Sequence, residues 1–198
     1  RSIYLALQKV SPSEKICVTS DPLELKNANK VVFPGQGSMF GCVQKLKKNG
    51  FYDEILHFTS DKPFLGICLG KQILFNKSEE GNSLGLGLLA GKVVRFNKSK
   101  DAGNLINTEF KVPHMGWNRI NAEPDGQGHP LLSGIATGTH MYFVHSFCVP
   151  VSAYTLASCT YGIDFTAMVA RDNFLGTQFH PERSGLVGAR ILQNFLDM

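Results

Sequence analysis

The sequence predicts an α/β protein, in which a mostly parallel sheet lies between two layers of helices and carries an added antiparallel β region. Three observations lead to this fold class. Short apolar runs alternate with amphipathic stretches in the first part of the chain, which is typical of a parallel sheet with helices on both faces. From Leu84 onward strand-like segments follow one another with turns between them. Finally, residues 184–198 have the spacing of an amphipathic helix.

The elements of the first part are predicted from apolar runs and their boundaries. The chain opens on a helical-looking segment, residues 2–7, without the strand that usually precedes such a helix. We therefore expect a first strand and loop to be missing from this sequence. Apolar runs bounded by polar residues, proline or glycine predict buried strands at residues 16–18, 31–33 and 63–66. Helical spacing predicts helices at residues 39–48 and 71–76.

The second part of the chain is dominated by predicted strands. They are expected at residues 88–96, 110–120, 142–149, 154–160, 166–169 and 175–179. Turns between them favour antiparallel pairing, so we expect this region to fold against the parallel sheet. No internal repeat, low-complexity segment or linker divides the chain, which predicts one domain covering residues 1–198.

Composition and charge narrow the function classes. The 198 residues are 43% hydrophobic and 18% charged, which is typical of a globular domain with an apolar core. Lys and Arg are scattered and the net charge is only +4, which argues against a nucleic-acid-binding surface. No apolar run approaches the roughly 20 residues of a membrane helix. The five cysteines form no Cys-x-x-Cys pair, so we expect free thiols in a reducing, cytoplasmic setting and no zinc site.

A cysteine between glycines is the first candidate for chemistry. The motif Gly-Ile-Cys-Leu-Gly at residues 66–70 follows a predicted buried strand, and its glycines permit a sharp turn from strand to helix around Cys68. Backbone N–H groups and the positive end of the helix that follows favour the thiolate over the thiol. The motif therefore indicates a cysteine nucleophile, with a buried structural cysteine in a turn as the alternative.

A histidine and a glutamate after another strand supply a base. In Gln-Phe-His-Pro-Glu at residues 178–182, His180 leaves the end of a predicted strand and can take a proton from a thiol on a neighbouring strand. Glu182 can accept a hydrogen bond from the other ring nitrogen and fix the tautomer. A lone histidine is more often a surface or core residue, but the adjoining glutamate and the separate cysteine turn favour a catalytic role.

A glycine-rich turn at residues 34–38, Pro-Gly-Gln-Gly-Ser, supplies a third element. An amide around Gly37, together with the N–H of Leu69, can hold the oxyanion that forms when a thiolate attacks a carbonyl. The turn alone is a weak signal, because glycine-rich turns end many strands. It lacks the Gly-Lys-Ser/Thr ending of a phosphate-binding loop.

Taken together, the three motifs resemble the class I, triad-type glutamine amidotransferases. The resemblance covers essentially the whole chain. It is strongest to the glutaminase subunits of imidazole glycerol phosphate synthase, because of Pro-His-Met-Gly-Trp-Asn at 113–118, Tyr-Phe-Val-His-Ser-Phe at 142–147 and Gly-Thr-Gln-Phe-His-Pro-Glu-Arg-Ser-Gly at 176–185. The family implies a flavodoxin-like three-layer fold and hydrolysis of glutamine without metal or organic cofactor. It also implies a partner, the (β/α)8-barrel cyclase of histidine biosynthesis.

The resemblance assigns roles to individual positions. Cys68, His180 and Glu182 match the catalytic triad. The amino-acid end of glutamine is expected to contact the side chains of Gln72 and Glu80 and the backbone of His145, Ser146 and Phe147. The partner protein is expected to contact Trp117, Tyr142 and Arg183.

Two positions depart from the family pattern, and three other functions compete. Gln36 replaces a small apolar residue beside the oxyanion turn, and Lys71 replaces a methionine beside the nucleophile. We expect the Lys71 side chain to point to solvent, with a lowering of the thiol pKa as the alternative. The competing functions are a glutaminase serving another synthase, a Cys-His peptidase, and a catalytically silent regulatory subunit.

Overall fold

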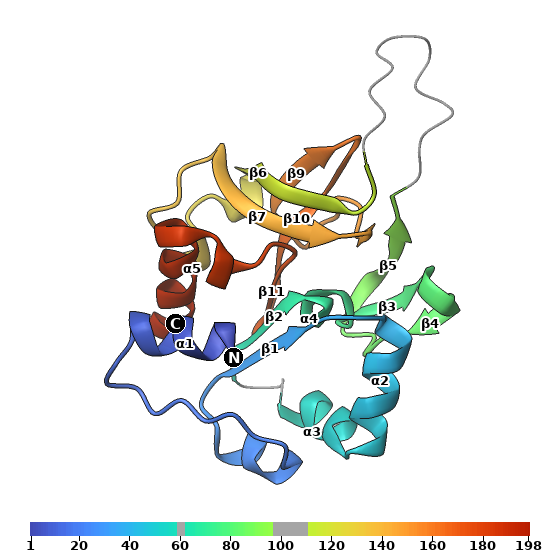
Figure 1. Ribbon diagram of the computed structural model, residues 1–198, viewed down its shortest axis with the longest axis vertical. Coiled ribbons are helices and arrows are strands. Elements are labelled where there is room, and N and C mark those ends of the chain that lie inside the picture. Colours follow the sequence, from blue (N-terminus) through green and yellow to red (C-terminus); the bar gives the residue numbers. More distant parts are fainter. Residues whose placement is uncertain (59–61, 97–110) are drawn as a thin grey trace.

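The computed structural model describes residues 1–58, 62–96 and 111–198. Its centre is a mixed seven-stranded sheet (Figure 1). In spatial order the strands are β1 (Val31–Gly35), β2 (Phe64–Cys68), β11 (Phe174–Thr177), β10 (Ile163–Arg171), β9 (Thr155–Tyr161), β6 (His114–Ala122) and β7 (Thr139–His145). Residue 110, predicted as the start of a strand, lies outside the described residues.

Strand pairing divides this sheet into a parallel and an antiparallel part. β1 and β11 both run parallel to β2, with Gly35 opposite Cys68 and Thr177 opposite Ile67. The other neighbours, from β11 to β7, pair antiparallel. The α/β class and an antiparallel region are therefore present, but the antiparallel strands continue the parallel ones in one sheet instead of packing against it. β11, expected in the antiparallel region, belongs to the parallel part.

A smaller sheet forms beside the first. Its strands are, in order, β4 (Ser83–Leu84), β3 (Phe75–Ser78), β5 (Leu89–Arg95) and β8 (Phe147–Cys148). The predicted helix at residues 71–76 is wrong, because helix α4 (Leu69–Gln72) is a single turn and β3 begins at Phe75. Phe75 is fully buried and pairs with Leu89, so a non-local partner outweighs the local helical spacing.

The predicted strand at residues 16–18 is also wrong. This segment is irregular, and Cys17 and Val18 lie on the surface, Val18 with 78% of its area exposed. A short apolar run gains strand structure from burial and pairing, and none of these three residues is fully buried.

Helices cover both faces of the sheet. α1 (Ser2–Val10) and α5 (Gly185–Asp197) pack together on one face, while α2 (Met39–Lys48), with the predicted bounds, and α3 (Phe51–Phe58) cover the other (Figure 1). The side chains of Leu65 and Ile67 join the α5 core, whereas Phe64 joins the α2 core. Alternate residues of a strand point to opposite faces, so the fully buried β2 contributes to both cores.

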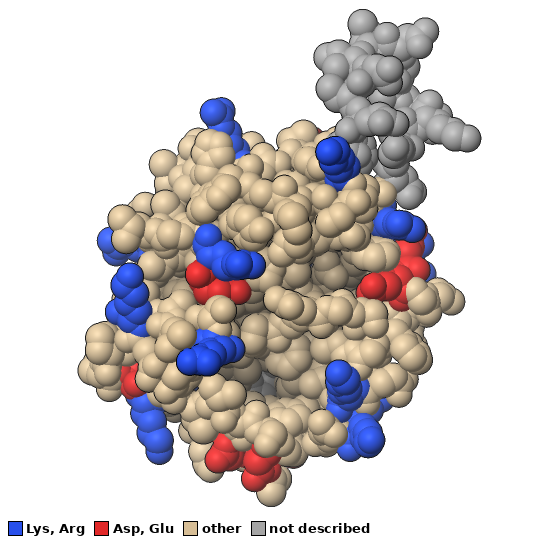
Figure 2. Space-filling model, in the orientation of Figure 1, with Lys and Arg blue, Asp and Glu red and all other residues tan. Residues whose placement is uncertain are grey.

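The distribution of surface charge and the character of the helices can both be followed in the described residues. Figure 2 shows that, on this face, Lys and Arg side chains are spread over the molecule and interspersed with Asp and Glu. None of the helices in the described part of the chain combines the length and apolarity needed to cross a membrane.

Candidate active site

Cys68 lies at a strained turn between β2 and α4. Its backbone has φ 55° and ψ −106°, a conformation that residues other than glycine rarely adopt. The two glycines of the motif are required by space. A Cβ at Gly70 would lie 1.9 Å from the carbonyl oxygen of Phe33, and one at Gly66 would lie 2.3 Å from the carbonyl oxygen of Gly70. The sharp turn predicted for this motif is therefore present.

The electrostatic support expected from the following helix is smaller than the sequence suggested. α4 has four residues, so its macrodipole is small and only the N–H groups of its single turn lie near the sulfur. The sulfur itself is largely buried and, besides its interaction with His180, has two polar contacts. Its thiol donates to the carbonyl oxygen of Val144 at 3.9 Å, and it accepts from Nε2 of Gln178 at 3.7 Å.

His180 and Glu182 form a buried pair. Nδ1 of His180 lies 3.0 Å from Oε1 of Glu182, and the two side chains are 5% and 9% exposed. Burial opposes a charged imidazole, but hydrogen bonding and charge attraction to Cys68 and Glu182 outweigh it and raise the pKa of His180 to about 9. Nε2 of His180 has no well-aligned hydrogen bond within the described residues, which leaves it available to a reacting group.

The backbone of His180 is held from β7. Its N–H donates to the carbonyl oxygen of Tyr142 at 2.9 Å. The hydroxyl of Ser184 donates to the carbonyl oxygen of His180 at 2.7 Å and accepts from the Tyr142 N–H at 3.0 Å. The imidazole is thus positioned by two strands, β11 before it and β7 beside it.

The glycine-rich turn lies next to the cysteine because β1 and β2 are parallel neighbours. Gly35 pairs with Cys68, and a Cβ at Gly35 would lie 3.1 Å from the Cβ of Leu69. Gly37 has φ +95°, which favours glycine at this position, and the side chain of Gln36 is exposed. The structure therefore brings the predicted oxyanion residues to the same edge of the sheet.

The predicted substrate-binding residues fall into two groups. Gln72 is buried and donates to the carbonyl oxygen of Phe147 at 2.9 Å, so it joins the segment of His145, Ser146 and Phe147 between β7 and β8. The carboxylate of Glu80, in contrast, accepts from the N–H of Met39 at 2.8 Å, at the first turn of α2. Glu80 is therefore held by the first turn of α2, and not by the segment between β7 and β8.

The three predicted partner-facing residues form one exposed patch. Trp117 is 57% exposed and its ring lies 6.0 Å from that of Tyr142. The guanidinium of Arg183 lies 5.4 Å from the centre of the Tyr142 ring. Met115, which was not expected from the sequence, is 64% exposed and lies two residues before Trp117, so both point to the same face of β6.

Lys71 is not where the sequence led us to expect it. Its side chain is fully buried instead of pointing to solvent, and Nζ donates to the carbonyl oxygen of Thr166 at 2.6 Å. The absence of a side chain at Gly176 makes room for it, since a Cβ there would lie 2.5 Å from Cγ of Lys71. Burial lowers the pKa of Lys71 to about 7, although the charges of Cys148 and Cys68 act in the opposite direction.

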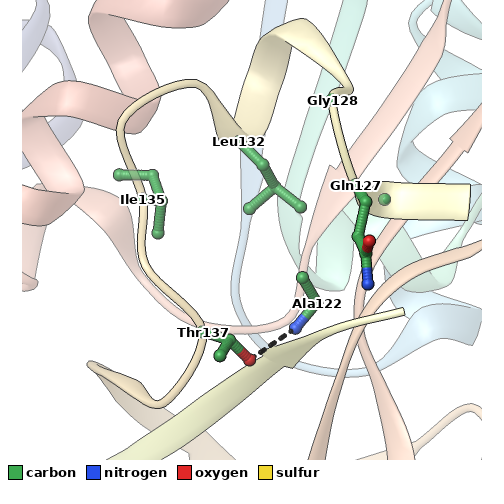
Figure 3. Close-up of a pocket in the computed structure, with 7 residues that line it drawn as sticks. Ala122, Gln127, Gly128, Leu132, Ile135 and Thr137 are labelled. Atoms are coloured by element: carbon green, nitrogen blue, oxygen red, sulfur yellow. Dashed lines mark hydrogen bonds between the residues drawn. The ribbon is translucent and has the colours of Figure 1, made fainter. Parts of the chain in front are cut away.

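Other features of the described residues offer no competing centre. Across residues 1–58, 62–96 and 111–198, no group of three His, Cys, Asp or Glu side chains is placed to hold a metal ion. A surface pocket of about 430 Å³ lies between the end of β6 and residues 126–137, where the Ala122 N–H donates to the Thr137 hydroxyl at 3.2 Å (Figure 3). None of the candidate site residues lines it.

A comparison with protein families shows to which family of enzymes this chain belongs. The model of the family described as glutamine amidotransferase class-I matches residues 7–198. The chain belongs to this family.

Curated relatives of this amidotransferase agree with one another. It is 45% identical over 210 residues to a Dechloromonas aromatica protein named imidazole glycerol phosphate synthase subunit HisH, covering 100% of this chain and 90% of that protein. Proteins of the same name from Nitrosomonas europaea and Escherichia coli K12 are 44% identical over 198 residues and 41% identical over 181. The match to the Nitrosomonas protein covers 99% of this chain and 92% of that protein. The match to the Escherichia coli protein covers 91% of this chain and 86% of that protein. The resemblance inferred from the motifs is therefore confirmed.

Solved structures confirm the fold of the amidotransferase. One described as a glutamine amidotransferase has a TM-score of 0.70 at 18% identity, covering 100% of this chain and 92% of that one. A putative GMP synthase subunit from Thermoplasma acidophilum has a TM-score of 0.69 at 19% identity, with 100% and 86% covered. At these identities the similarity concerns the fold alone.

Two polar residues of this amidotransferase were not expected from the sequence. Gln178 contacts the sulfur of Cys68, and His114 contacts His145 at 3.0 Å. Both lie inside the quoted motifs, but their partners lie on other elements. Only the sheet topology shows which side chains meet.

Proposed function

We propose that this amidotransferase hydrolyses L-glutamine to glutamate and ammonia as the glutaminase subunit of imidazole glycerol phosphate synthase, in histidine biosynthesis. The observation that carries the proposal is the pairing of a buried cysteine, held in a strained turn, with a buried His180–Glu182 pair. The family and the HisH relatives support the same reaction.

In the first half of the reaction, the thiolate of Cys68 attacks the side-chain amide carbon of glutamine. Because the pKa of His180 is raised to about 9, its imidazole is protonated at neutral pH and can donate that proton to the departing ammonia. A γ-glutamyl thioester remains on Cys68. The N–H groups of Gly37 and Leu69 are proposed to stabilise the negative oxygen of the intermediate.

In the second half, His180 is neutral and takes a proton from water. The resulting hydroxide attacks the thioester carbon and the bond to sulfur breaks, which returns Cys68 and His180 to the thiolate and imidazolium forms. The new γ-carboxyl group gives its proton to solvent and the product leaves as glutamate. Glu182 keeps the ring in one tautomer through its contact with Nδ1.

The substrate and the partner are proposed from the residues around this centre. We place the amino-acid end of glutamine between Gln72, Glu80 and the backbone of residues 145–147. We place a (β/α)8-barrel cyclase against Trp117, Tyr142 and Arg183, in a heterodimer that passes ammonia between its two proteins without release to water. The exposed Trp117 ring, the half-buried Tyr142 ring and the Arg183 guanidinium are residue types favoured at protein interfaces. The free thiols of all five cysteines support a cytoplasmic setting.

The test is a glutaminase assay of the wild-type chain and Cys68→Ala, each with and without the cyclase and its nucleotide substrate. We expect slow hydrolysis by the wild type alone, acceleration by orders of magnitude in the complex, and no hydrolysis by Cys68→Ala. Cys159→Ala is a matched control, because burial, with Asp164 nearby, raises the pKa of this thiol to about 12 and makes it unreactive. Full activity of Cys68→Ala would refute the proposed nucleophile, and full activity of the isolated chain would refute the coupling.

A further inference from the structure

A row of hydrogen-bonded polar groups runs from half-buried Asn118 on strand β6 toward the active site. Asn118 Nδ2 lies 3.2 Å from Nε2 of His114. Nδ1 of His114 lies 3.0 Å from Nε2 of His145, which is directly opposite on β7. Nδ1 of His145 lies 2.8 Å from the carbonyl oxygen of Phe147. Four residues on three strands are therefore joined end to end.

The direction of every hydrogen bond in this row follows from its two ends. The amide of Asn118 has one possible orientation, because its nitrogen donates to the carbonyl oxygen of Thr160 and its oxygen accepts from the N–H of Arg119. Nε2 of His114 must then accept, so its Nδ1 carries the proton. At the other end the carbonyl oxygen of Phe147 can only accept, so Nδ1 of His145 also carries its proton. The two deductions agree at the contact between the imidazoles.

The surroundings keep both imidazoles neutral. The His114 ring is stacked between those of Tyr161, at 4.0 Å, and Phe143, at 4.8 Å between ring centres. Burial lowers the pKa of His114 to about 4. Burial also lowers the pKa of His145, and a positive charge on His114 would lower it further, whereas the hydrogen bond to Phe147 acts in the opposite direction. Two neutral rings permit one donor and one acceptor each, as the row requires.

A second row runs from the same carbonyl group to the nucleophile. Nε2 of Gln72 donates to the carbonyl oxygen of Phe147 at 2.9 Å and to Oε1 of Gln178 at 3.2 Å. With its oxygen so engaged, Gln178 presents its Nε2 to the sulfur of Cys68 at 3.7 Å. Gln178 is fully buried, so this donor is shielded from bulk water.

We propose that these two rows form one directed hydrogen-bond network, in which Asn118, His114 and His145 act as positioning residues and hold Gln178 as a hydrogen-bond donor to the Cys68 thiolate. The proposal rests on the function proposed above, for which it supplies a further stabilising contact to the nucleophile. It also connects β6, the strand that carries the exposed Trp117, to the sulfur. A change at the surface of β6 would thereby alter the reactivity of Cys68.

Several charged or titratable groups act on Cys68 besides Gln178, and the experiment must hold them constant. They are His180 from the segment after β11, with Glu182 behind it, and Lys71 from α4, which also interacts with Cys148 of β8 and His145 of β7. The variants below leave all of these residues in place.

The first experiment determines the tautomers of His114 and His145 by ¹⁵N NMR of the imidazole rings in the wild-type chain at neutral pH. We expect the Nδ1–H form of both, which is the minor form of histidine in water. Asn118→Asp places a carboxylate, which can only accept, against Nε2 of His114 and is expected to move the proton to that nitrogen. Asn121→Asp adds the same charge to the same strand outside the network and is expected to leave both tautomers unchanged. An Nε2–H form of either ring in the wild type would overturn the proposal.

The second experiment measures the rate of Cys68 alkylation by iodoacetamide against pH. Gln178→Met removes the N–H donor at similar volume, and we expect the midpoint of the profile to rise by about one pH unit. We expect a smaller rise for Asn118→Asp and none for Asn121→Asp. An unchanged midpoint in Gln178→Met would overturn the proposal. Asn118 lies near the surface, so Asn118→Asp decides the question if Gln178→Met fails to fold, and an unchanged midpoint would then count equally against it.

Alkylation separates this proposal from the proposed function. It reports the thiolate of the isolated chain without glutamine or cyclase. If the tautomers and the midpoint shifts of the variants are as expected but the wild-type chain hydrolyses no glutamine in the complex, the proposed function is refuted and the network is retained. If the wild-type enzyme is fully active but the midpoints of the variants are unchanged, the network is refuted and the function is retained.

Discussion

Replacing Lys71 by methionine is expected to stabilise the protein most at low pH. The side chain is fully buried, and burial lowers its pKa to about 7, against the charges of Cys148 and Cys68. In the unfolded chain the lysine has its ordinary pKa of about 10.4. The charged form is therefore penalised in the folded protein and not in the unfolded chain.

The sign and size of the effect follow from proton binding. Between the two pKa values the unfolded chain binds more protons than the folded one, so the stability of the wild type rises with pH in this window. Below about pH 7 both states carry the charge and the whole penalty is present, on the order of 5 kcal/mol as an upper bound. Methionine has no such penalty. Its loss of the hydrogen bond to the Thr166 carbonyl oxygen costs about 1–3 kcal/mol at every pH.

The measurement is urea unfolding of the wild type, Lys71→Met and Lys48→Met at several values from about pH 6 to about pH 9. The gain in unfolding free energy for Lys71→Met is expected to fall by about 2.3 kcal/mol between pH 7, where half of the folded protein has already lost the proton, and pH 9. Lys48 is exposed in the last turn of α2, so its substitution is expected to have a small effect that does not depend on pH. A gain from Lys71→Met that is constant or grows with pH would refute the reasoning.

Three further substitutions test the geometry of the site. Gly70→Ala places a Cβ 1.9 Å from the carbonyl oxygen of Phe33 and is expected to lower the unfolding free energy by about 1–3 kcal/mol in urea, whereas wild-type stability would show that the turn can relax. Ser184→Ala removes the hydrogen bond to the His180 carbonyl oxygen, so steady-state kinetics should show kcat lower by about tenfold with KM unchanged; a change in KM alone would contradict a role in positioning His180. Glu182→Gln removes the carboxylate at Nδ1, and NMR titration should show a His180 pKa below the present value of about 9, while an unchanged pKa would leave Cys68 as its main cause.

The sequence was informative where structure depends on local pattern. The bounds of α2 were predicted because its apolar residues recur on one face. The structure adds a cap that the prediction did not use, since the Ser38 hydroxyl accepts from the N–H of Gly41 at 3.1 Å. Residues 71–76 also have helical spacing, but there the backbone is taken up by other segments. The Leu86 N–H donates to the Ile73 carbonyl oxygen at 2.7 Å, which is a partner that local spacing does not reveal.

The candidate site was predictable as a set of motifs and not as a set of contacts. The motifs placed Cys68, His180 and Glu182 at strand ends, and the structure brings all three to one edge of the sheet. The sequence did not reveal that Lys71 is buried, because the space for its side chain is left by Gly176, which has no side chain and lies on another strand. The contact between His114 and His145 likewise depends on the register of β6 and β7.

The direction of one short strand explains how the base reaches the nucleophile. β11 has four residues and runs parallel to β2, so both strands end at the same edge and His180 emerges beside Cys68. An antiparallel β11 would end at the opposite edge, roughly 13 Å away, which is farther than any side chain can compensate. The next strand in the sheet, β10, is the first to pair antiparallel. At the far end of the antiparallel region, β7 holds the His180 backbone through the carbonyl oxygen of Tyr142. The parallel direction of β11 therefore brings His180 beside Cys68, and the antiparallel region then holds His180 in that position.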